Sequence, residues 1–221
     1  MKIFVSDLHV GSPLFRDGKR LIELFNDPKV EEIYILGDVL DVWHKDVTTI
    51  TRLNALFIDA INSCSKIKVI LKGNHDPDID TMRSVFYNTI VTDKFEMDLF
   101  GKKAILIHGD EFDKRAYRRD VYFKIHKFFS KYEINLKAFV RNIVYSYAMF
   151  KKGLSNNDLV LQGEIDVFNK YSRDYDIIVM GHSHLPKMVR KKDADYLNCG
   201  CIVYKPTYLA AEKNTIFLKR L

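Results

Sequence analysis

Five short apolar runs in this sequence each end in aspartate, asparagine or histidine, usually next to a glycine. The endings are Asp7 and His9 after Val5, Asp38 after Leu36, Asn74 and His75 after Leu71, His108 after Ile107, and His182 and His184 after Met180. Such runs are typical of buried strands, and ligands in open α/β sheets bind beyond the carboxyl ends of the strands. We therefore expect a fold that brings five distant strand ends to one place.

The alternation of apolar runs and amphipathic stretches in the first half of the chain favours an α/β fold. Strands are predicted over residues 2–5, 33–36, 68–71, 95–99, 104–107, 177–180, 196–203 and 215–218, and helices over 19–25 and 49–63. Residues 95–99 and 104–107 would form a hairpin that turns near Gly101.

The pattern changes near residue 111, where helical periodicity replaces the strand-like runs until about residue 172. We therefore expect an α/β core over residues 1–110 and 173–221, with residues 111–172 inserted as a helical lid. Residues 114–152 hold 11 Lys and Arg against Asp120 and Glu133, a net charge of +9, so the rest of the chain sums to −3 against a total of +6. The basic character of the chain is thus concentrated in the predicted lid.

The composition is that of a globular protein, with 47% hydrophobic and 29% charged residues. No apolar stretch reaches the length of about 18 residues that a membrane-spanning helix needs. The segment Met1–Val10 meets Asp7 and His9 too early for a secretory signal, so the sequence predicts a cytoplasmic location.

The residue types at the strand endings point to metal binding. The chain has seven histidines, and five of them lie in these endings, with only His44 and His126 outside. A mixed set of carboxylate, amide and imidazole ligands is what two divalent transition ions need. Because two neighbouring cations repel each other, at least one carboxylate must lie between them.

The endings also resemble the motif series of the calcineurin-like metallophosphoesterases. The matching segments are Asp7-x-His9, Gly37-Asp38, Gly73-Asn74-His75-Asp76, His108-Gly109 and Gly181-His182-Ser183-His184, in that order. The resemblance implies a four-layer α/β/β/α sandwich and a dinuclear metal-dependent phosphoester or pyrophosphate hydrolase. It further implies that one ion is held by Asp7, His9 and His184, the other by Asn74, His108 and His182, with Asp38 as the bridge.

The resemblance implies further roles around these ligands. His75 would face the substrate phosphate and assist the leaving oxygen, so His75 and Asp38 are the expected catalytic residues. Asp76 would orient His75 or, alternatively, cap a helix before Pro77, and Asp110 would orient a ligand histidine or end its strand with a turn. The mixed ligand set suits Mn²⁺ first, with Fe or Zn²⁺ as alternatives, better than it suits Mg²⁺.

A helical insertion after His108-Gly109-Asp110 is similar to that of the UDP-2,3-diacylglucosamine pyrophosphohydrolases of lipid A synthesis. In that group a helical lid receives acyl chains, so the resemblance implies a UDP-sugar lipid as substrate, cleaved to the lipid monophosphate and UMP. Residues 117–150 hold ten aromatic residues among basic ones. Substrate contacts are predicted for Arg118, Lys124, Lys127 and Arg141, and the lid would also contact an anionic membrane peripherally, at the inner face. Alternatively, the aromatic residues only pack the lid onto the core and the basic ones are solvated.

Two other function classes stay open at the level of sequence. The first is a phosphodiesterase or phosphatase that acts on nucleotides or nucleic acid, because a basic and aromatic surface can stack bases and follow phosphates. It is supported by His75, since the lipid enzymes carry arginine at that position and the Asn-His form belongs to the broader family. The second is a non-catalytic scaffold with the same fold, which would be expected to have lost ligands, whereas all seven ligand positions are intact.

Overall fold

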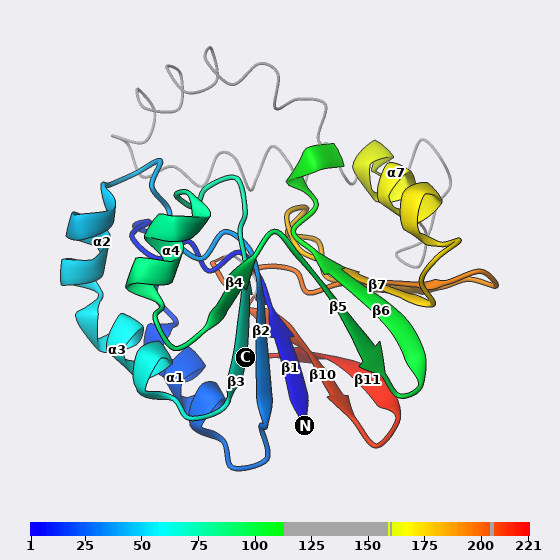
Figure 1. Cartoon of the computed structure of the whole chain (residues 1–221), viewed down its shortest axis with the longest axis horizontal. Coiled ribbons are helices and arrows are strands. Elements are labelled where there is room, and N and C mark those ends of the chain that lie inside the picture. Colours follow the sequence, from blue (N-terminus) through cyan, green and yellow to red (C-terminus); the bar gives the residue numbers. More distant parts are fainter. Residues whose placement is uncertain (113–158, 160, 204–205) are drawn as a thin grey trace.

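The computed structural model describes residues 1–112, 159, 161–203 and 206–221. Its centre consists of two β-sheets packed face to face, one of six strands in the order β11-β10-β1-β2-β3-β4 and one of five in the order β5-β6-β7-β9-β8 (Figure 1). The interior between them is formed by apolar side chains of both sheets, among them Phe4, Leu36, Leu71, Leu106 and Val179.

The six-stranded sheet contains three of the strands whose endings the sequence marks. Its strands are β1 (Lys2–Val5), β2 (Glu32–Leu36), β3 (Ile67–Leu71), β4 (Ile90–Thr92), β10 (Thr207–Glu212) and β11 (Thr215–Arg220). Strands β1 to β4 are parallel neighbours, and β10 and β11 extend the sheet as an antiparallel hairpin on the other side of β1. The carboxyl ends of β1, β2 and β3 therefore lie side by side at one edge.

The five-stranded sheet contains the other two marked strands. Its strands are β5 (Lys94–Leu99), β6 (Lys102–Ile107), β7 (Ile177–Met180), β8 (Lys187–Arg190) and β9 (Asp195–Asn198). Strands β6, β7 and β9 are parallel, with β5 and β8 antiparallel at the two edges. The endings of β6 and β7 therefore lie next to each other, as those of β1, β2 and β3 do in the six-stranded sheet.

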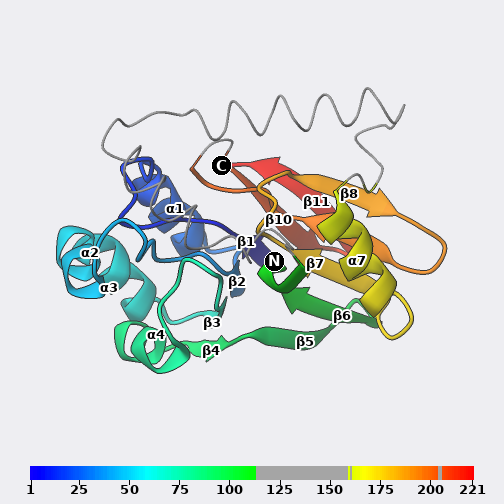
Figure 2. The ribbon, with the colours of Figure 1, turned by 90° about the horizontal axis from the view of Figure 1, so that it is seen from above.

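Helices cover the outer face of each sheet and complete four layers, seen edge-on in Figure 2. They are α1 (Gly18–Asn26), α2 (Val47–Leu53), α3 (Ala55–Ser63), α4 (Ile79–Val85) and α7 (Gln162–Tyr171), with a short 3₁₀ turn η1 (Asp110–Phe112). Helices α1 to α4 bury Leu21, Phe57 and Met82 against the six-stranded sheet. Helix α7 buries Val167 and Phe168 against the five-stranded one. The predicted α/β/β/α sandwich is confirmed.

Two predicted elements differ in the structure for local reasons. The helix predicted over 49–63 is two helices, because Asn54 leaves helical geometry and its side-chain amide donates to the carbonyl of Ile50 at 2.9 Å. The strand predicted over 196–203 ends at Asn198, and the chain turns at Gly200, which has a φ of +79°. Three strands, β4, β8 and β10, and helix α4 were not predicted.

Strand β8 begins with a buried lysine. The ammonium of Lys187 lies 3.0 Å from the carboxylate of Glu164 on α7. A lysine is buried only where a partner offsets the loss of hydration, and no sequence pattern links these two positions.

Most of the predicted lid, residues 113–158 and 160, lies outside the described residues. Helix α7 falls within the predicted range 111–172 and packs on the five-stranded sheet as its outer layer. No helix in the described part of the chain is both long and apolar enough to cross a bilayer.

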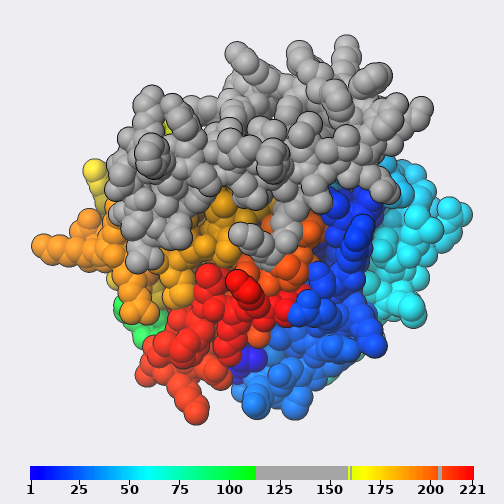
Figure 3. Space-filling model, turned by 180° about the vertical axis from the view of Figure 1, so that it is seen from behind, coloured from blue at the N-terminus to red at the C-terminus, as the bar shows by residue number. Residues whose placement is uncertain are grey.

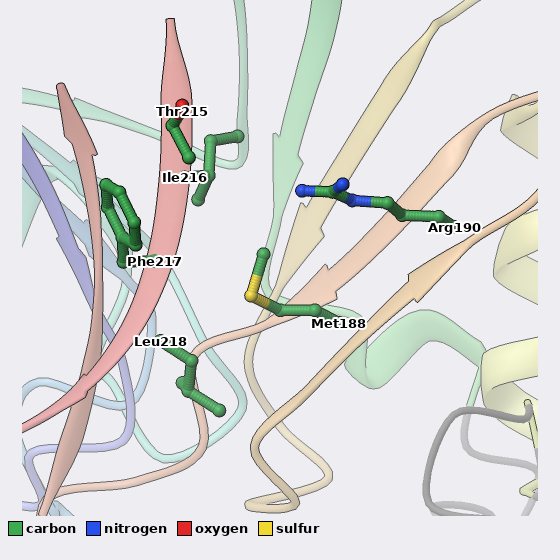
Figure 4. Close-up of a pocket in the computed structure, with 6 residues that line it drawn as sticks. All are labelled: Met188, Arg190, Thr215, Ile216, Phe217 and Leu218. Carbon is green, nitrogen blue, oxygen red and sulfur yellow. The ribbon is translucent and has the colours of Figure 1, made fainter. Parts of the chain in front are cut away.

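A groove of about 610 Å³ opens between the free edges of the two sheets (Figure 4). It is lined by Met188 and Arg190 of β8 and by residues 215–218 of β11. Figure 3 shows this face from behind, with β11 in red and the β8–β9 hairpin in orange. None of the predicted site residues that the structure describes lines the groove.

Candidate metal centre

The five marked strand endings converge at one end of the sandwich. Strands β1, β2 and β3 deliver Asp7 with His9, Asp38, and Asn74 with His75, while β6 and β7 deliver His108 and the pair His182 and His184. The chain bonds these endings together: the amide of His9 donates to the carbonyl of Asp38 at 2.9 Å, and the amide of His182 donates to the carboxylate of Asp7 at 3.0 Å. Both sheets therefore contribute to a single centre.

The backbone at this centre is held in an uncommon conformation. Asp7, His9, Asp38, His182 and His184 all have φ between +49° and +57°, the left-handed region that side chains other than glycine rarely adopt. Such residues cost of order 1–3 kcal/mol each and persist only where their surroundings hold them. The conformation turns alternate side chains of a short segment toward the same point, which explains how His182 and His184 both reach the centre.

Glycines beside these residues make the close approach possible. A Cβ atom on Gly73 would overlap Oδ1 of Asp38, and one on Gly181 would overlap the hydroxyl of Ser6. At Gly37, which has a φ of +85°, a Cβ would lie 2.5 Å from the ring of His108. Any larger residue at these positions would push a ligand side chain away.

One group of potential ligands consists of Asp7, His9, Asp38 and His184, whose ligand atoms lie within 4.8 Å of one another. Nε2 of His184 lies 2.8 Å from Oδ1 of Asp7. Nε2 of His9 lies 3.9 Å from Oδ1 of Asp7 and 3.8 Å from Oδ2 of Asp38, too far for hydrogen bonds. The three side chains therefore surround a point between them.

A second group consists of Asp38, His108 and His182, with Asn74 beside it. Nε2 of His108 lies 3.3 Å from Oδ1 of Asp38 and 3.3 Å from Oδ1 of Asn74. Nδ1 of His108 lies 2.8 Å from the carbonyl of Leu36, which makes it the donor and leaves Nε2 as the nitrogen that faces the centre. Asp38 belongs to both groups and lies where a bridging carboxylate must lie.

The electrostatics of the centre are those of a charged pair of sites. Burial alone would raise the pKa of Asp38, but the charges of His108 and His75 hold that pKa well below its usual range. For the imidazoles the two effects have the opposite signs, because burial alone would lower the pKa of His9 and of His108. The carboxylates of Asp41 and Asp38 raise the pKa of His9 to about 9. The carboxylate of Asp38 raises the pKa of His108 to about 10. Without metal, protons on these imidazoles balance the buried carboxylates.

The donor set fits divalent cations. Nε2 of His9 is buried, has no hydrogen-bond partner among the described residues and faces two carboxylates. A buried polar atom without a partner is costly, and a cation between it and the carboxylates would satisfy all three. Imidazole, carboxylate and amide donors suit Mn²⁺, Fe or Zn²⁺. The geometry does not select one metal among them.

The model of the calcineurin-like phosphoesterase family matches residues 3–186, the span that contains every strand ending of the centre. The chain belongs to this family. It is a metallophosphoesterase, a hydrolase with a dinuclear cluster of His and Asp ligands.

Individual relatives of this metallophosphoesterase are distant. The chain is 32% identical over 124 residues to a UDP-2,3-diacylglucosamine hydrolase from Nitrosococcus oceani, a match that spans 52% of the chain and 49% of that protein. It is 23% identical to a Coxiella burnetii protein of the same name, over 83% of the chain and 80% of that protein. Among solved structures, an archaeal phosphodiesterase shares the fold with a TM-score of 0.51 and 17% identity, covering 100% of this chain and 99% of that one.

Asp41 was not predicted as a site residue, yet the metallophosphoesterase places its carboxylate beside three imidazoles. Its Oδ1 lies 3.0 Å from Nδ1 of His75, and its Oδ2 lies 2.8 Å from Nδ1 of His44 and 3.3 Å from Nδ1 of His9. The available signal was its position three residues after Asp38 in the same buried ending, followed three residues later by His44.

Asp76 makes neither of the contacts expected of it. Both carboxylate oxygens of Asp76 accept backbone hydrogen bonds, from Leu40 at 2.7 Å and Gly73 at 2.9 Å, so it ties two strand endings together while Asp41 contacts His75. The helix that follows is capped by Asp78 instead. Burial and the charge of Asp38 raise the pKa of Asp76 to about 7. Asp110 begins the turn η1, one of the two roles that the sequence left open for it. Its charge contributes, after that of Asp38, to the raised pKa of His108, whose ring is oriented by the carbonyl of Leu36.

Two further buried residues support the ligands and were not predicted. The hydroxyl of Ser6 donates to Asp7 at 2.5 Å, with the carbonyl of Leu36 at 2.9 Å as its second acceptor. The amide of Asn198 donates to the carbonyl of Gly181 at 2.7 Å and to the hydroxyl of Ser183 at 3.1 Å, so it holds the chain on both sides of His182. The residues predicted to contact substrate, Arg118, Lys124, Lys127 and Arg141, lie outside the described residues.

Proposed function

We propose that this metallophosphoesterase hydrolyses the pyrophosphate bond of a UDP-sugar lipid such as UDP-2,3-diacylglucosamine, releasing the lipid monophosphate and UMP. The proposal that the protein is a hydrolase is carried by one observation: Asp38 belongs to both ligand groups, and the amide of His75 donates a hydrogen bond to it. The lipid part is supported by distant relatives that bear the name UDP-2,3-diacylglucosamine hydrolase.

The ligand roles follow from the two groups. Asp7, His9 and His184 would hold one ion, Asn74, His108 and His182 the other, and Asp38 both. Two divalent ions so placed supply Lewis acidity toward the phosphoryl oxygens and an activated water. The chain itself holds the carboxylates and imidazoles at fixed positions, through left-handed backbone and buried hydrogen bonds.

His75 is the residue that we assign to the leaving oxygen. Its amide donates to Oδ1 of Asp38 at 2.8 Å, which fixes its backbone beside the shared carboxylate. Its Nδ1 faces Asp41, and its ring stacks on Trp43 with centroids 3.7 Å apart. An imidazole held in this way keeps Nε2 for the substrate, where it can donate a proton to the departing phosphate.

The choice of a lipid substrate rests on sequence as well as on relatives. Residues 117–150 combine ten aromatic residues with a strong positive charge, as a segment that receives acyl chains and faces anionic headgroups would. Within this proposal, Arg118, Lys124, Lys127 and Arg141 contact the substrate, and the protein works in the cytoplasm at the inner face of the membrane.

A substrate panel tests the proposal. The manganese-loaded protein is given UDP-2,3-diacylglucosamine in detergent, UDP-N-acetylglucosamine, a cyclic dinucleotide, single-stranded DNA and an aryl phosphodiester. We expect the diacyl substrate to have a kcat/KM at least about 100-fold above that of UDP-N-acetylglucosamine, because burying two acyl chains adds several kcal/mol of binding. Equal rates on these two UDP-sugars would reject the lipid assignment while leaving hydrolysis intact.

A second candidate is a phosphodiesterase for nucleotides or nucleic acid, and His75 favours it. The resemblance described for the sequence implies arginine at this position in the lipid pyrophosphohydrolases and histidine in the broader family. Preferred turnover of the cyclic dinucleotide or of DNA in the same panel would establish this alternative, because a basic, aromatic segment also suits stacked bases.

A further inference from the structure

Strand β11 is a free edge of the six-stranded sheet. All of its residues pair with β10, and no strand in the described part of the chain pairs with its other side. An unpaired edge presents backbone N–H and C=O groups on which another strand can add, and proteins usually protect it with bulges, prolines or charges. Charges occur only at the last two residues of β11, and its middle consists of Ile216, Phe217 and Leu218.

The pairing with β10 determines which backbone groups of β11 face outward. The amide of Leu221 donates to the carbonyl of Pro206 at 2.9 Å, in register with the β10–β11 ladder, so Leu221 turns its backbone groups toward β10. This orientation alternates along an antiparallel ladder. Phe217 therefore also turns its N–H and C=O toward β10, while Ile216 and Leu218 direct theirs to the free edge.

The apolar side chains of β11 are exposed on both faces of the sheet. Leu218 pairs with Leu209 of β10, which belongs to the core between the two sheets. Leu218 and Ile216 therefore point into the groove beside Met188 (Figure 4). Phe217 lies on the opposite face, and it is 43% exposed against 38% for Leu218. Apolar side chains gathered at a free edge indicate a surface that is covered by a partner.

We propose that β11 pairs with β11 of a second copy of this chain, antiparallel, about a twofold axis at Phe217. Residues that lie opposite each other in such a pair must orient their backbone groups alike, either both toward the partner or both toward β10. The axis must therefore pass through a residue and not between two residues. With the axis at Phe217, this residue lies opposite the partner's Phe217, and Ile216 lies opposite the partner's Leu218.

This register suits the sequence of the strand. Its centre is apolar on both chains, and cross-strand pairs of aromatic and aliphatic residues stabilise antiparallel sheets. Toward the ends, Lys219 lies opposite the partner's Thr215, so no two cations face each other. Lys219 also forms an ion pair with Glu212 of its own chain, with 3.5 Å between Nζ and Oε1, which offsets its charge beside the interface.

The neighbouring registers are less favourable. An axis at Leu218 would place Phe217 opposite the partner's Lys219, and so pair an apolar residue with a cation. An axis at Ile216 would place Lys219 opposite the partner's Lys213, and like charges directly opposite each other destabilise a sheet. The strand is thus complementary to itself in one register, which favours a second copy over a different protein.

The pairing leaves both metal centres open. Strand β11 is antiparallel to β10, which is antiparallel to β1, so β11 runs toward the metal centre as β1 does. Antiparallel pairing of two copies therefore places their centres at opposite ends of the dimer. None of the ligand residues lies in the interface, so the inference is independent of the proposed function.

Sedimentation equilibrium of the full chain tests the association. Two short strands form an interface at the low end of the specific range, so we expect a dissociation constant on the order of 10 μM. Phe217→Lys should raise this constant at least about 10-fold, because two cations would then lie opposite each other. Phe100→Lys, the same change at a residue that is 37% exposed in the β5–β6 turn, should change it less than about twofold.

Either of two results overturns the proposal. A wild-type chain that stays monomeric up to about 200 μM, roughly 20 times the expected constant, would leave the edge to a strand of a different protein. A dimer that Phe217→Lys retains would show that another surface holds the copies together. Urea unfolding of each variant shows whether the monomer remains folded.

A cysteine pair tests the register without relying on a disruptive change. In a non-hydrogen-bonded antiparallel pair the Cα atoms are about 4.5 Å apart, within reach of a disulfide. Phe217→Cys should therefore form a disulfide-linked dimer on mild oxidation. Thr215→Cys should not, because the two copies of residue 215 would lie about 13 Å apart along the strands. The wild-type chain, which has three free cysteines, gives the background. Equal cross-linking of the two variants, or none in Phe217→Cys, overturns the proposal.

Discussion

The two ends of the sandwich use the same backbone conformation for different purposes. At one end, Phe100 with Gly101 and Lys213 with Asn214 have positive φ angles in the two-residue turns of the β5–β6 and β10–β11 hairpins. At the other end, Asp7, His9, Asp38, His182 and His184 have the same conformation but are buried or half-buried, and they carry acids and imidazoles. At the end with the two hairpin turns, which we call the turn end, positive φ angles reverse the chain. At the end with the metal centre, which we call the site end, they direct side chains toward one point.

The comparison shows where the molecule stores strain. Turn residues with positive φ match the right-handed twist of a hairpin, and glycine and asparagine adopt them at little cost. Aspartate and histidine at a buried strand end have no such local reason, so hydrogen bonds from other endings must hold them. Matched substitutions at the two ends should therefore differ in both size and kind.

The largest difference is expected between Asp38→Asn and Asp98→Asn, the same chemical change at opposite ends. Asp38 belongs to both ligand groups, whereas Asp98 accepts one hydrogen bond from Gly101 at 2.9 Å in a hairpin turn. Asp38→Asn should lower aryl phosphodiester hydrolysis by more than about 100-fold, beyond the effect of residues outside a ligand set. Asp98→Asn should stay within about twofold of wild type. Rates within tenfold of each other would contradict the bridging role of Asp38, and metal content of both proteins is the second readout.

The next difference concerns Gly181→Ala and Gly101→Ala. A Cβ on Gly181 would overlap Ser6 and approach Oδ2 of Asp7 to 2.8 Å, whereas one on Gly101 would meet nothing within 4 Å. We expect a loss of about 3 kcal/mol in unfolding free energy at Gly181 from overpacking, and about 1 kcal/mol at Gly101 from its positive φ. Urea unfolding measures both values. Only Gly181→Ala should also lose metal affinity, and a larger loss of stability at Gly101 would reverse our view of the two ends.

Proton binding should also distinguish the site end. The pKa values of about 9 for His9 and about 10 for His108 lie above the unfolded value of about 6.5. The stability that these protons contribute is therefore present below about pH 6.5 and is lost as pH rises through 9 and 10. Metal-free protein should become less stable across this range, while Mn²⁺ affinity should rise because fewer protons must leave. Calorimetric titration at pH 7, 8 and 9 measures the affinity, and a decrease with pH would show that these imidazoles are not displaced by metal.

The smallest effect is expected at the turn end. Lys213 and Asn214 both have positive φ, the conformation of a type I′ turn, in which glycine is preferred at the second position. Asn214→Gly should raise unfolding free energy by about 0.5 kcal/mol or leave it unchanged, without altering metal content or hydrolysis. A change in metal content would mean that the two ends are coupled through β10 and β1.

Much of this architecture follows from the sequence, because apolar runs and their endings are local signals. The strands that lead to Asp7, Asp38, Asn74, His108 and His182 were predicted, and so was the four-layer fold that the family resemblance implies. The break at Asn54 was missed because it depends on one side-chain hydrogen bond to Ile50. A side-chain hydrogen bond that competes with the helix backbone does not change the spacing of apolar residues, so periodicity cannot predict it.

The rest of the site could not be predicted because it depends on contacts between distant segments. Asp41 lies near Asp38 in the sequence, but its partners His9 and His75 are about 30 residues away on either side. The burial of Lys187 depends on Glu164 in another layer. Asp76 was expected either to orient His75 or to cap a helix before Pro77, whereas its carboxylate oxygens accept hydrogen bonds from the backbone of Leu40 and Gly73. Tertiary geometry alone decides between such partners.

The origin of the ligands in both sheets has a consequence for how the protein is made. Asp7 is synthesised well before His184, which lies 2.8 Å from it in the folded protein. A nascent chain on the ribosome can form the parallel strands β1 to β3 early, yet it cannot close the centre until β7 has emerged. Cation capture should therefore be a late event in biogenesis, and the bound pair would then act as a clasp between the two halves of the sandwich.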